Sequence, residues 1–409
     1  MSRPSTPMTV VVPTRERADV LASALLTVTA QDYDDLEIVV SDNFSADSTE
    51  SVVRGLADPR VRYVNPGRRL SMAAHWEFAL SHVRNGWVTI IGDDDGLLPG
   101  ALTKAAEAAS QLGVDALRSR VCEYFWPSLT GLAYGRMHVP LGRGHEVRES
   151  SDWMARVLAG KALYTQLPVL YNGGFVSTRV LARLRATTGS VYRSCAPDVY
   201  SAAAIASLVP RYGYLHEPLA INGASAHSTG TSFSKGGTSA PAARFRSEPN
   251  LPYHDDVPMC ADGQYPRSLF VYFYEAYLQS SMLREPAPAS RHREFLRDLL
   301  MRTPRSDSAL QAWARLFAVH HRLDFGAIEQ QAALRRWPAS LHDLPALLKA
   351  KLGELRVGAP TLPIIDVAAA TVAARQIVDA GPHRAESAAQ LLARAWTRLV
   401  PGLNGSPAR

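Results

Sequence analysis

The first hundred residues alternate short apolar runs with stretches of helical periodicity, and this alternation constrains the fold more than any other feature. The apolar runs cover residues 9–12, 37–41, 61–64 and 87–92. Between them, apolar residues recur at the spacing of a helix that buries one face. An order of this kind predicts a parallel sheet covered by helices on both faces. We therefore expect an α/β fold with a mostly parallel central sheet, followed by a helical C-terminal region.

Three consecutive carboxylates, Asp93, Asp94 and Asp95, directly follow the apolar run 87–92. In open α/β sheets, ligands bind at the carboxyl ends of the strands. Adjacent like charges repel, so a positive partner is needed to neutralise them. Oxygen ligands suit Mg²⁺ and Mn²⁺, so the triplet predicts a divalent cation that carries a phosphorylated ligand. A solvated acidic turn is the alternative, because charge runs in loops are common.

Composition excludes several classes of protein. The chain has 409 residues, of which 46% are hydrophobic, enough for a sizeable core. Its three cysteines lie far apart, with neither a disulfide framework nor zinc-ligand spacing. The net charge of +6 comes without a basic tract interleaved with aromatic residues, so nucleic acid is not an expected partner. No signal segment or membrane-spanning run is recognised, and we expect a cytoplasmic protein, at most peripheral at the inner membrane face.

Periodicity and turn residues divide the chain into three parts. Residues 8–230 carry the strand and helix alternation and form the expected catalytic domain. Residues 224–268 are rich in Gly, Ser and Pro, and a stretch of that kind is typical of a flexible active-site loop or a linker. Residues 269–409 show helical periodicity. Candidate roles for this last region are acceptor binding, formation of a homodimer and contact with a membrane.

Four segments, in this order, resemble the motifs of family 2 glycosyltransferases, which have the A-type nucleotide-sugar fold. They are residues 11–17 (VVPTRER), 40–47 (VSDNFSAD), 92–99 (GDDDGLLP) and 196–198 (APD). Each match is weak by itself, but four in the right order at ordinary spacing are specific. The resemblance covers residues 8–230 and implies an inverting, metal-dependent transferase that uses a nucleotide-sugar donor.

The resemblance assigns the nucleotide to the ends of the first two strands and to the acidic triplet. A carboxylate at Asp42 can accept the imide N–H of a pyrimidine base, which uracil and thymine offer, in a charge-assisted hydrogen bond. This implies a UDP- or dTDP-sugar; a turn carboxylate that bonds its own backbone is the alternative. Arg17 is predicted to cover the surface. The nucleotide-binding residues implied in this way are Pro13, Thr14, Arg15, Asp42 and Asp93.

The metal ligands implied by the resemblance are Asp94, Asp95 and His227, with Mn²⁺ or Mg²⁺ as the cofactor. Asp94 matches the family position five residues before the proline, here Pro99. Asp95 would alternatively orient the acceptor or hold the loop, and a solvated loop histidine is the alternative for His227. Many relatives have an aspartate ahead of the triplet, where this chain has Gly92. That departure leaves the roles of the three carboxylates open.

Asp198 matches the position of the catalytic base. Inversion requires the acceptor hydroxyl to attack the anomeric carbon opposite the departing nucleotide, and a carboxylate on that side must take the proton. Such a base is typically worth roughly 10²–10⁴-fold in rate. The alternative is that Asp198 only caps the helix that follows Pro197.

Five further residues are weaker candidates for the donor or acceptor pocket. His75 lies on the helix that usually flanks the donor in such enzymes. Lys235, in the 224–268 loop, could contact phosphate. Trp153 could stack on an acceptor, although core packing is the alternative for an aromatic residue. Gly173 and Gly174 would allow an acceptor to approach the backbone closely.

The predicted function is transfer of a sugar from a UDP- or dTDP-sugar to a hydroxyl of a glycan, a lipid-linked saccharide or a secondary metabolite. The first alternative is a nucleotidyltransferase that makes a nucleotide sugar. It usually needs a glycine-rich loop after the first strand, and residues 13–17 contain no glycine. The second alternative is a non-catalytic protein that binds sugar nucleotides, which the presence of both Asp94 and Asp198 disfavours.

Overall fold

The computed structural model describes residues 6–129, 135–228, 248–284, 291–342, 354–357 and 364–381. A large mixed sheet lies at the centre, with strand order β11-β7-β6-β9-β4-β1-β2-β3, and β10 pairs with β5, β6 and β8. The strands are β1 Met8–Thr14, β2 Leu36–Asp42, β3 Val61–Val64, β4 Trp87–Ile90, β5 Gly96–Leu97, β6 Ala116–Phe125, β7 Met137–Pro140, β8 His145–Glu149, β9 Gly174–Ser177, β10 Arg211–Ala224 and β11 Glu354–Val357.

The N-terminal half of the sheet is parallel, as its sequence predicts. Strand β1 pairs in parallel with both β2 and β4, and β2 pairs in parallel with β3. Residues of β1 are buried on both faces: Val11 packs on one side of the sheet, and Val10 and Val12 pack on the other. A strand covered on both faces is continuously apolar because it has no solvent side. Beyond β4 the sheet becomes mixed, since β9 is antiparallel to both β4 and β6.

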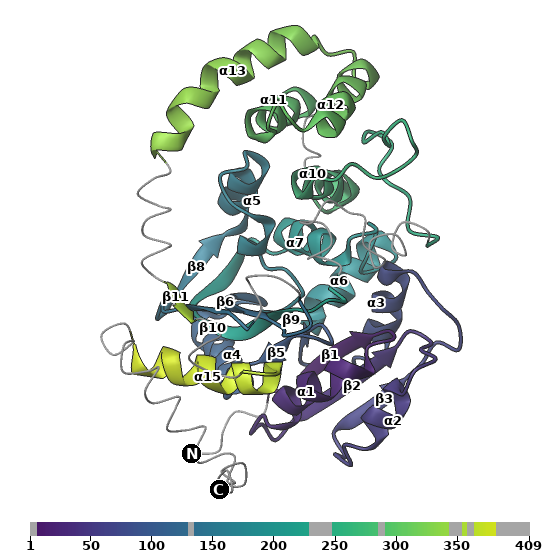
Figure 1. The fold of residues 1–409 in the computed structure, drawn as a ribbon, viewed down its shortest axis with the longest axis vertical. Coiled ribbons are helices and arrows are strands. Elements are labelled where there is room, and N and C mark those ends of the chain that lie inside the picture. Colours follow the sequence, from purple (N-terminus) through teal and green to yellow (C-terminus); the bar gives the residue numbers. More distant parts are fainter. Residues whose placement is uncertain are drawn as a thin grey trace, which may run out of the picture.

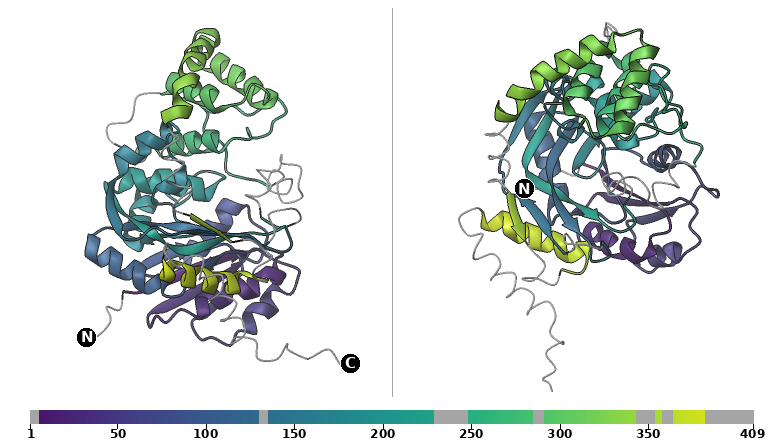
Figure 2. Two further views of the ribbon diagram at one scale, coloured as in Figure 1. Left: turned by 60° about the vertical axis from the view of Figure 1, so that its left-hand side comes forward. Right: turned by 45° about the horizontal axis from the view of Figure 1, so that its top comes forward.

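Helices cover both faces, which confirms the expected α/β fold (Figure 1). Helices α1, α2, α4 and α15 pack on one face, and α3, α5, α6 and α7 pack on the other, where α10 to α12 extend the core further (Figure 2, left). Their bounds are α1 Ala18–Thr29, α2 Thr49–Arg54, α3 Met72–Ser81, α4 Ala101–Leu112, α5 Ser150–Leu158, α6 Thr178–Thr188, α7 Pro197–Leu208, α10 Leu269–Gln279, α11 His292–Arg302, α12 Ser308–His320, α13 Phe325–His342 and α15 Val367–Ala380, with short 3₁₀ helices η1 Tyr164–Gln166 and η2 Ser281–Leu283.

The expected helical C-terminal region is present in α10 to α13, and the described chain after α13 returns to the sheet. Strand β11 pairs with β7 and extends the edge of the sheet. Helix α15 packs against α1 and β10, and its Ile377 is buried with Val20 of α1 in one apolar cluster. The yellow α15 accordingly lies beside the purple α1 in Figure 1. The described end of the chain therefore belongs to the sheet domain.

The boundary between the catalytic domain and the loop stays a prediction, because residues 229–247 lie outside the described residues. Residues 248–268 form turns and extended chain without helix or strand. Helices α10 to α12 share one continuous apolar cluster with α7 of the sheet domain. Among the described residues, no helix combines the length and the apolar character that crossing a membrane requires.

Candidate active site

A cavity of about 410 Å³ is lined by the ends of β1 and β4 together with residues from α3, α7, β10 and α10. Its lining has two contrasting parts. The charged lining comes from the loops that follow strands: Arg15, Glu16, Arg17, Asp93, Asp94, Asp95, His227 and Glu248. The aromatic lining comes from helices and connecting segments: Trp76, Tyr164, Tyr171 and Tyr272.

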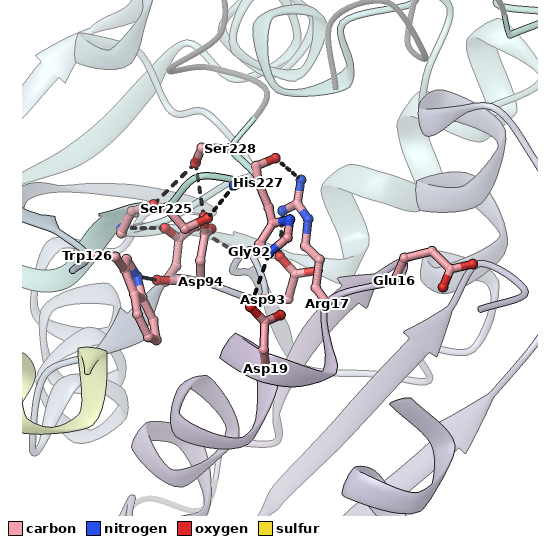
Figure 3. Close-up of polar contacts among 12 residues, drawn as sticks. Glu16, Arg17, Asp19, Gly92, Asp93, Asp94, Trp126, Ser225, His227 and Ser228 are labelled. Carbon is pink, nitrogen blue, oxygen red and sulfur yellow. Dashed lines mark hydrogen bonds and ion pairs between the residues drawn. The ribbon is translucent and has the colours of Figure 1, made fainter. Parts of the chain in front are cut away.

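Asp94 is held by the loop that follows β10 (Figure 3). Its Oδ2 atom accepts hydrogen bonds from the hydroxyls of Ser225 at 2.6 Å and Ser228 at 2.9 Å. Its backbone carbonyl accepts a bond of 2.9 Å from the indole N–H of Trp126. Side chain and backbone are thus both fixed, and Asp94 keeps one orientation at the cavity. No position among 224–228 except His227 was expected to contribute, so the two serines were missed by sequence reasoning.

Asp95 is almost fully engaged by hydrogen bonds. Its Oδ2 atom accepts from the hydroxyl of Tyr171 at 2.6 Å and the N–H of Gly92 at 2.9 Å, and its Oδ1 accepts from the N–H of Gly223 at 2.8 Å. Burial, together with the neighbouring charge of Asp94, raises the pKa of Asp95 to about 7. These contacts hold the loop that follows β4, which is one of the roles considered for Asp95 in the sequence analysis.

The glycine at position 92 has a physical reason. An ideal Cβ there would lie 2.8 Å from Oδ2 of Asp95 and 2.8 Å from the hydroxyl oxygen of Tyr171. An aspartate in its place would therefore disrupt the hydrogen bond between those two side chains. Glycine at position 92, where many relatives have an aspartate, leaves room for the hydrogen bond between Tyr171 and Asp95.

Arg17 contradicts its predicted surface position. Its guanidinium contacts Oδ1 of Asp93 at 2.7 Å and donates to the backbone carbonyl of His227 at 2.6 Å. Burial alone would lower the pKa of Arg17, but the charges of Asp93 and Asp94 outweigh it, and the pKa lies above its usual value. Glu16 has a φ of 54°. Its side chain points away from Asp93 and Asp94, whereas the side chain of Arg17, the next residue, lies beside them (Figure 3).

Asp198 lies in the first turn of α7, at the cavity. Its Oδ2 accepts a hydrogen bond of 2.6 Å from the hydroxyl of Tyr164. The N-cap residue of α7 is Ala196, so Asp198 is not the N-cap residue itself, although its carboxylate interacts with the N–H groups of Asp198 and Val199 in the first turn. Burial raises the pKa of Asp198, and the bond from Tyr164 opposes that rise. A buried carboxyl that is held in one orientation is suited to take a proton from a bound hydroxyl.

The predicted nucleotide residues are only partly brought together. Pro13, Thr14, Arg15 and Asp93 line the cavity. The guanidinium of Arg15 forms an ion pair with Glu248, a residue from the far side of the 224–268 loop. These four residues are placed where a nucleotide could contact them, and their roles stay predictions.

Asp42 corrects the expectation of a base contact. It is not among the described residues of the cavity lining, and it is only 2% exposed. Its carboxylate accepts hydrogen bonds from the hydroxyl of Tyr63 at 2.7 Å and the N–H of Ser45 at 3.0 Å. The side chain of Asp42 therefore holds its own loop, which is the alternative of a turn carboxylate that bonds its own backbone.

The predicted metal set of Asp94, Asp95 and His227 is not assembled. The imidazole Nε2 of His227 lies 3.1 Å from Oδ2 of Asp19 and faces away from the acidic triplet (Figure 3). In the described part of the chain, no three His, Cys, Asp or Glu side chains are grouped so that they could hold a metal ion by themselves. Among the acids, Asp94 remains the best placed ligand, because Asp93 is paired with Arg17 and Asp95 holds the loop.

The weaker pocket candidates divide in the same way. His75 lines the cavity, and its Nε2 lies 2.9 Å from the hydroxyl of Ser41. Burial, with the charge of Arg15, lowers the pKa of His75 to about 3, so its ring is neutral. Trp153 is outside the described lining and packs against the guanidinium of Arg148, 3.7 Å from the ring centre. Lys235 lies outside the described residues.

Gly173 and Gly174 are also outside the described lining, and packing explains both. Gly173 has a φ of 86°, a region that favours glycine. An ideal Cβ at Gly174 would lie 1.6 Å from the carbonyl oxygen of Val169. The expected close approach is therefore made by the protein's own backbone.

Sequence reasoning missed several lining residues, among them Tyr164, Glu248 and two residues of α10, Leu269 and Tyr272. They belong to no motif, and each reaches the cavity only through tertiary packing. The contact between Tyr164 and Asp198 joins residues far apart in sequence, so no local pattern could have indicated it.

Comparisons with known proteins agree with the motif assignment. The family model described as Glycosyl transferase family 2 matches residues 9–131. A Campylobacter jejuni protein, GalNAc(5)-diNAcBac-PP-undecaprenol beta-1,3-glucosyltransferase, is 36% identical over 107 residues, 25% of this chain and 35% of that protein. Succinoglycan biosynthesis protein ExoO of Rhizobium meliloti is 31% identical over 114 residues, 27% of this chain and 33% of that protein. The chain thus matches about a third of the length of each relative.

Among solved structures, S. aureus TarS 1–349 in complex with UDP-GlcNAc is similar with a TM-score of 0.45 and 13% identity, over 96% of this chain and 92% of that one. The mannosyltransferase PcManGT from Pyrobaculum calidifontis, in complex with GDP-Man and Mn2+, has a TM-score of 0.39 and 18% identity, over 81% of this chain and 87% of that one. The family match includes the segments of Thr14 and Asp94 and ends before Asp198. Residues 9–131 thus match the glycosyl transferase family 2 model, the same family that the motifs resemble.

Proposed function

We propose that this protein is an inverting glycosyltransferase that moves a sugar from a nucleotide-sugar donor to an acceptor hydroxyl with the help of a divalent cation. One observation carries the proposal: Asp94 and Asp198, from separate motifs, line the same cavity. Arg15 and Arg17 line it too and supply positive charge for a diphosphate. A sugar-nucleotide binder without activity would need no second buried carboxylate at this cavity besides the acidic triplet.

The residues present fit a cation held jointly by protein and substrate. Mg²⁺ and Mn²⁺ in such sites are bound through one or two carboxylates, with substrate phosphates and water completing the shell. Asp94 would supply the carboxylate, and the donor's diphosphate would supply further oxygens. When bound, the cation would stabilise the negative charge on the departing nucleoside diphosphate. The two serines on Oδ2 of Asp94 would keep its orientation fixed.

The protein's own part in the chemistry is proton transfer and orientation. The acceptor oxygen forms a bond to the anomeric carbon as the bond from that carbon to the diphosphate oxygen breaks. Asp198 takes the proton of the acceptor hydroxyl, and the electron pair of the broken bond stays on the diphosphate. Burial raises the pKa of Asp198, which makes its carboxylate a stronger base than that of an exposed aspartate.

For the donor, UDP- and dTDP-sugars are the first candidates, although the internal contacts of Asp42 weaken the argument that rested on that residue. For the acceptor, the names of the two relatives point to a lipid-linked saccharide or a glycan. Leu269 and Tyr272 of α10 line the cavity beside Asp198 and offer an apolar surface for the ring face of a sugar.

Product analysis tests the proposal. The protein is incubated with Mn²⁺ and a panel of UDP-, dTDP- and GDP-sugars, with and without saccharide acceptors, and the released nucleotide is identified. Release of a nucleoside diphosphate that is lost on adding a chelator supports sugar transfer. Release of pyrophosphate from a nucleoside triphosphate and a sugar phosphate would instead identify a nucleotidyltransferase. Tight nucleotide-sugar binding without release from any donor would leave only a binding protein.

A further inference from the structure

Two tyrosines of one short segment, residues 164–171, each donate a hydrogen bond to a carboxylate at the cavity. The hydroxyl of Tyr164 lies 2.6 Å from Oδ2 of Asp198, and the hydroxyl of Tyr171 lies 2.6 Å from Oδ2 of Asp95. Both tyrosines line the cavity. Hydrogen bonds of this length to an ionised acceptor are the strong, charge-assisted kind. The same segment therefore sets the orientation of the proposed base and of the loop that carries Asp94.

A buried arginine fixes this segment from behind. The Nε of Arg118 donates to the carbonyl of Thr165 at 2.7 Å, and its Nη1 donates to the carbonyls of Tyr171 at 3.1 Å and Asn172 at 2.7 Å. Burial lowers the pKa of Arg118 to about 10, so the side chain stays charged at neutral pH. Arg118 thus ties together the backbone next to Tyr164 and the backbone of Tyr171. The backbone that carries both tyrosines is therefore held in place by one side chain.

Burial is the largest influence on the pKa of Asp198, and the hydrogen bond from Tyr164 is the largest that opposes it. Besides Tyr164, the titratable groups near Asp198 are Tyr171, Tyr192 and Cys195. Burial raises the pKa of each of these three groups, so all are neutral in the working range of such an enzyme. The contact with Tyr164 is therefore the hydrogen bond from another side chain that favours the ionised carboxylate.

Resting on the proposed function, we propose that Tyr164 is the positioning residue of the base. Its hydroxyl donates to Oδ2 of Asp198 and holds the carboxylate in one orientation, from which it would take the proton of the acceptor hydroxyl. Tyr164 also keeps the carboxylate available as a base at neutral pH. Tyr171, which makes a hydrogen bond of the same length from the same segment, serves the acidic triplet instead and gives a matched comparison.

The test compares Tyr164→Phe with Tyr171→Phe in the full-length protein, with the donor that releases nucleoside diphosphate fastest. Loss of one hydrogen bond to the carboxylate should move the acidic limb of the pH profile of kcat/KM upward by about one pH unit in Tyr164→Phe. Activity of this variant should recover as the pH is raised, and its affinity for UDP with Mn²⁺ should equal that of the wild type. Tyr171→Phe should leave the acidic limb in place and weaken UDP binding.

A second measurement does not depend on turnover. The carboxyl carbon of Asp198 can be titrated by NMR in protein labelled at aspartate, with Asp198→Asn identifying its signal. The titration should move to higher pH in Tyr164→Phe and not in Tyr171→Phe. An unshifted titration in folded Tyr164→Phe, or equal shifts in the two variants, overturns the proposal. If the wild type releases nucleoside diphosphate from no donor, the proposed function fails, while the titration still decides whether Tyr164 controls Asp198.

Discussion

The charged and the aromatic linings of the cavity are built in different ways. The charged lining consists of loops tied to one another by hydrogen bonds and ion pairs, such as the contact of Arg17 with Asp93 and that of Asp94 with Ser225. The aromatic lining is built by packing, as where the ring of Tyr171 lies 5.4 Å from that of Trp76. Loops at strand ends are local in sequence and carry motifs, whereas packed aromatic residues converge from distant helices. The comparison teaches that the strand-end segments of the charged lining can be recognised in the sequence, whereas the residues of the aromatic lining cannot.

The largest expected effect is on the residue that lies between the two linings. Asp198→Asn removes the proposed base, so turnover should fall by roughly 10²–10⁴-fold. Affinity for UDP in the presence of Mn²⁺ should be unchanged, because the charged lining is intact. Steady-state kinetics and calorimetric binding on the same preparation check both statements. Turnover close to that of the wild type would remove Asp198 from the mechanism.

Arg17→Gln should break the charged lining from within. It leaves the buried carboxylate of Asp93 without its cation, a change that costs about 3 kcal/mol or more of the free energy of unfolding. Since burial already raises the pKa of Asp93, protonation should relieve the loss, which we expect to be large at pH 8 and smaller at pH 5. Denaturant unfolding at both pH values measures this.

Arg15→Gln is the matched control for that variant, because Arg15 also pairs with an acid at the cavity, and the side chain of that acid, Glu248, is 13% exposed against 3% for Asp93. Its effect on stability should be smaller. Equal losses in the two variants would contradict the view that Arg17 neutralises the acidic triplet.

Asp94→Ala should abolish the contribution of Mn²⁺ to nucleotide affinity. Mutation of a residue that only hydrogen-bonds to a metal ligand typically lowers metal affinity by roughly 10–100-fold. Removal of the ligand itself should therefore cost at least about tenfold. Binding of UDP with Mn²⁺ should then equal binding with chelator, as measured by calorimetry. A variant that still binds UDP more tightly with Mn²⁺ would transfer the ligand role to another residue.

The smallest effect concerns the support of the aromatic lining. Glu275 of α10 is fully buried, and burial raises its pKa from 4.5 to about 7 despite a hydrogen bond of 2.6 Å from Ser194. The native state therefore holds this proton more tightly than the unfolded chain, and stability should fall as the pH rises from 4.5 to about 7. Glu275→Gln mimics the protonated form, so it should be more stable than the wild type by about 1 kcal/mol at pH 8. Thermal unfolding should show this advantage vanishing near pH 4.5; the same advantage at every pH would argue against the raised pKa.

Much of the fold and of the charged lining could be predicted because both are local properties. The apolar runs placed β1, β2 and β4, and parallel strands bring their carboxyl ends to one edge, which carried Thr14 and Asp94 to the cavity. The predictions failed where a side chain from a distant part of the sequence contacts the residue. Asp42 has the expected position, but the hydroxyl of Tyr63 occupies it. Arg17 turns inward because Glu16 adopts a positive φ, which no local pattern indicated.

The C-terminal return of the chain shows the same limit on a larger scale. Helical periodicity predicted a helical C-terminal region, but neither the position of α15 nor its packing against α1. Tyr164, Leu269 and Tyr272 likewise reach the cavity through contacts that join distant segments. Such contacts depend on the folded whole, so they appear only when the structure is known.

The hydrogen bonding of β6 limits how the molecule could be divided. This strand ends at Phe125, just inside the segment that matches the family model, yet its neighbours β7, β9 and β10 all come from later in the chain. A polypeptide that ends after residue 131 would leave both edges of β6 without a paired strand, and unpaired strand edges promote aggregation. The end of the family match at residue 131 is therefore unsuitable as the end of a truncated protein. A truncated protein should extend at least through β10.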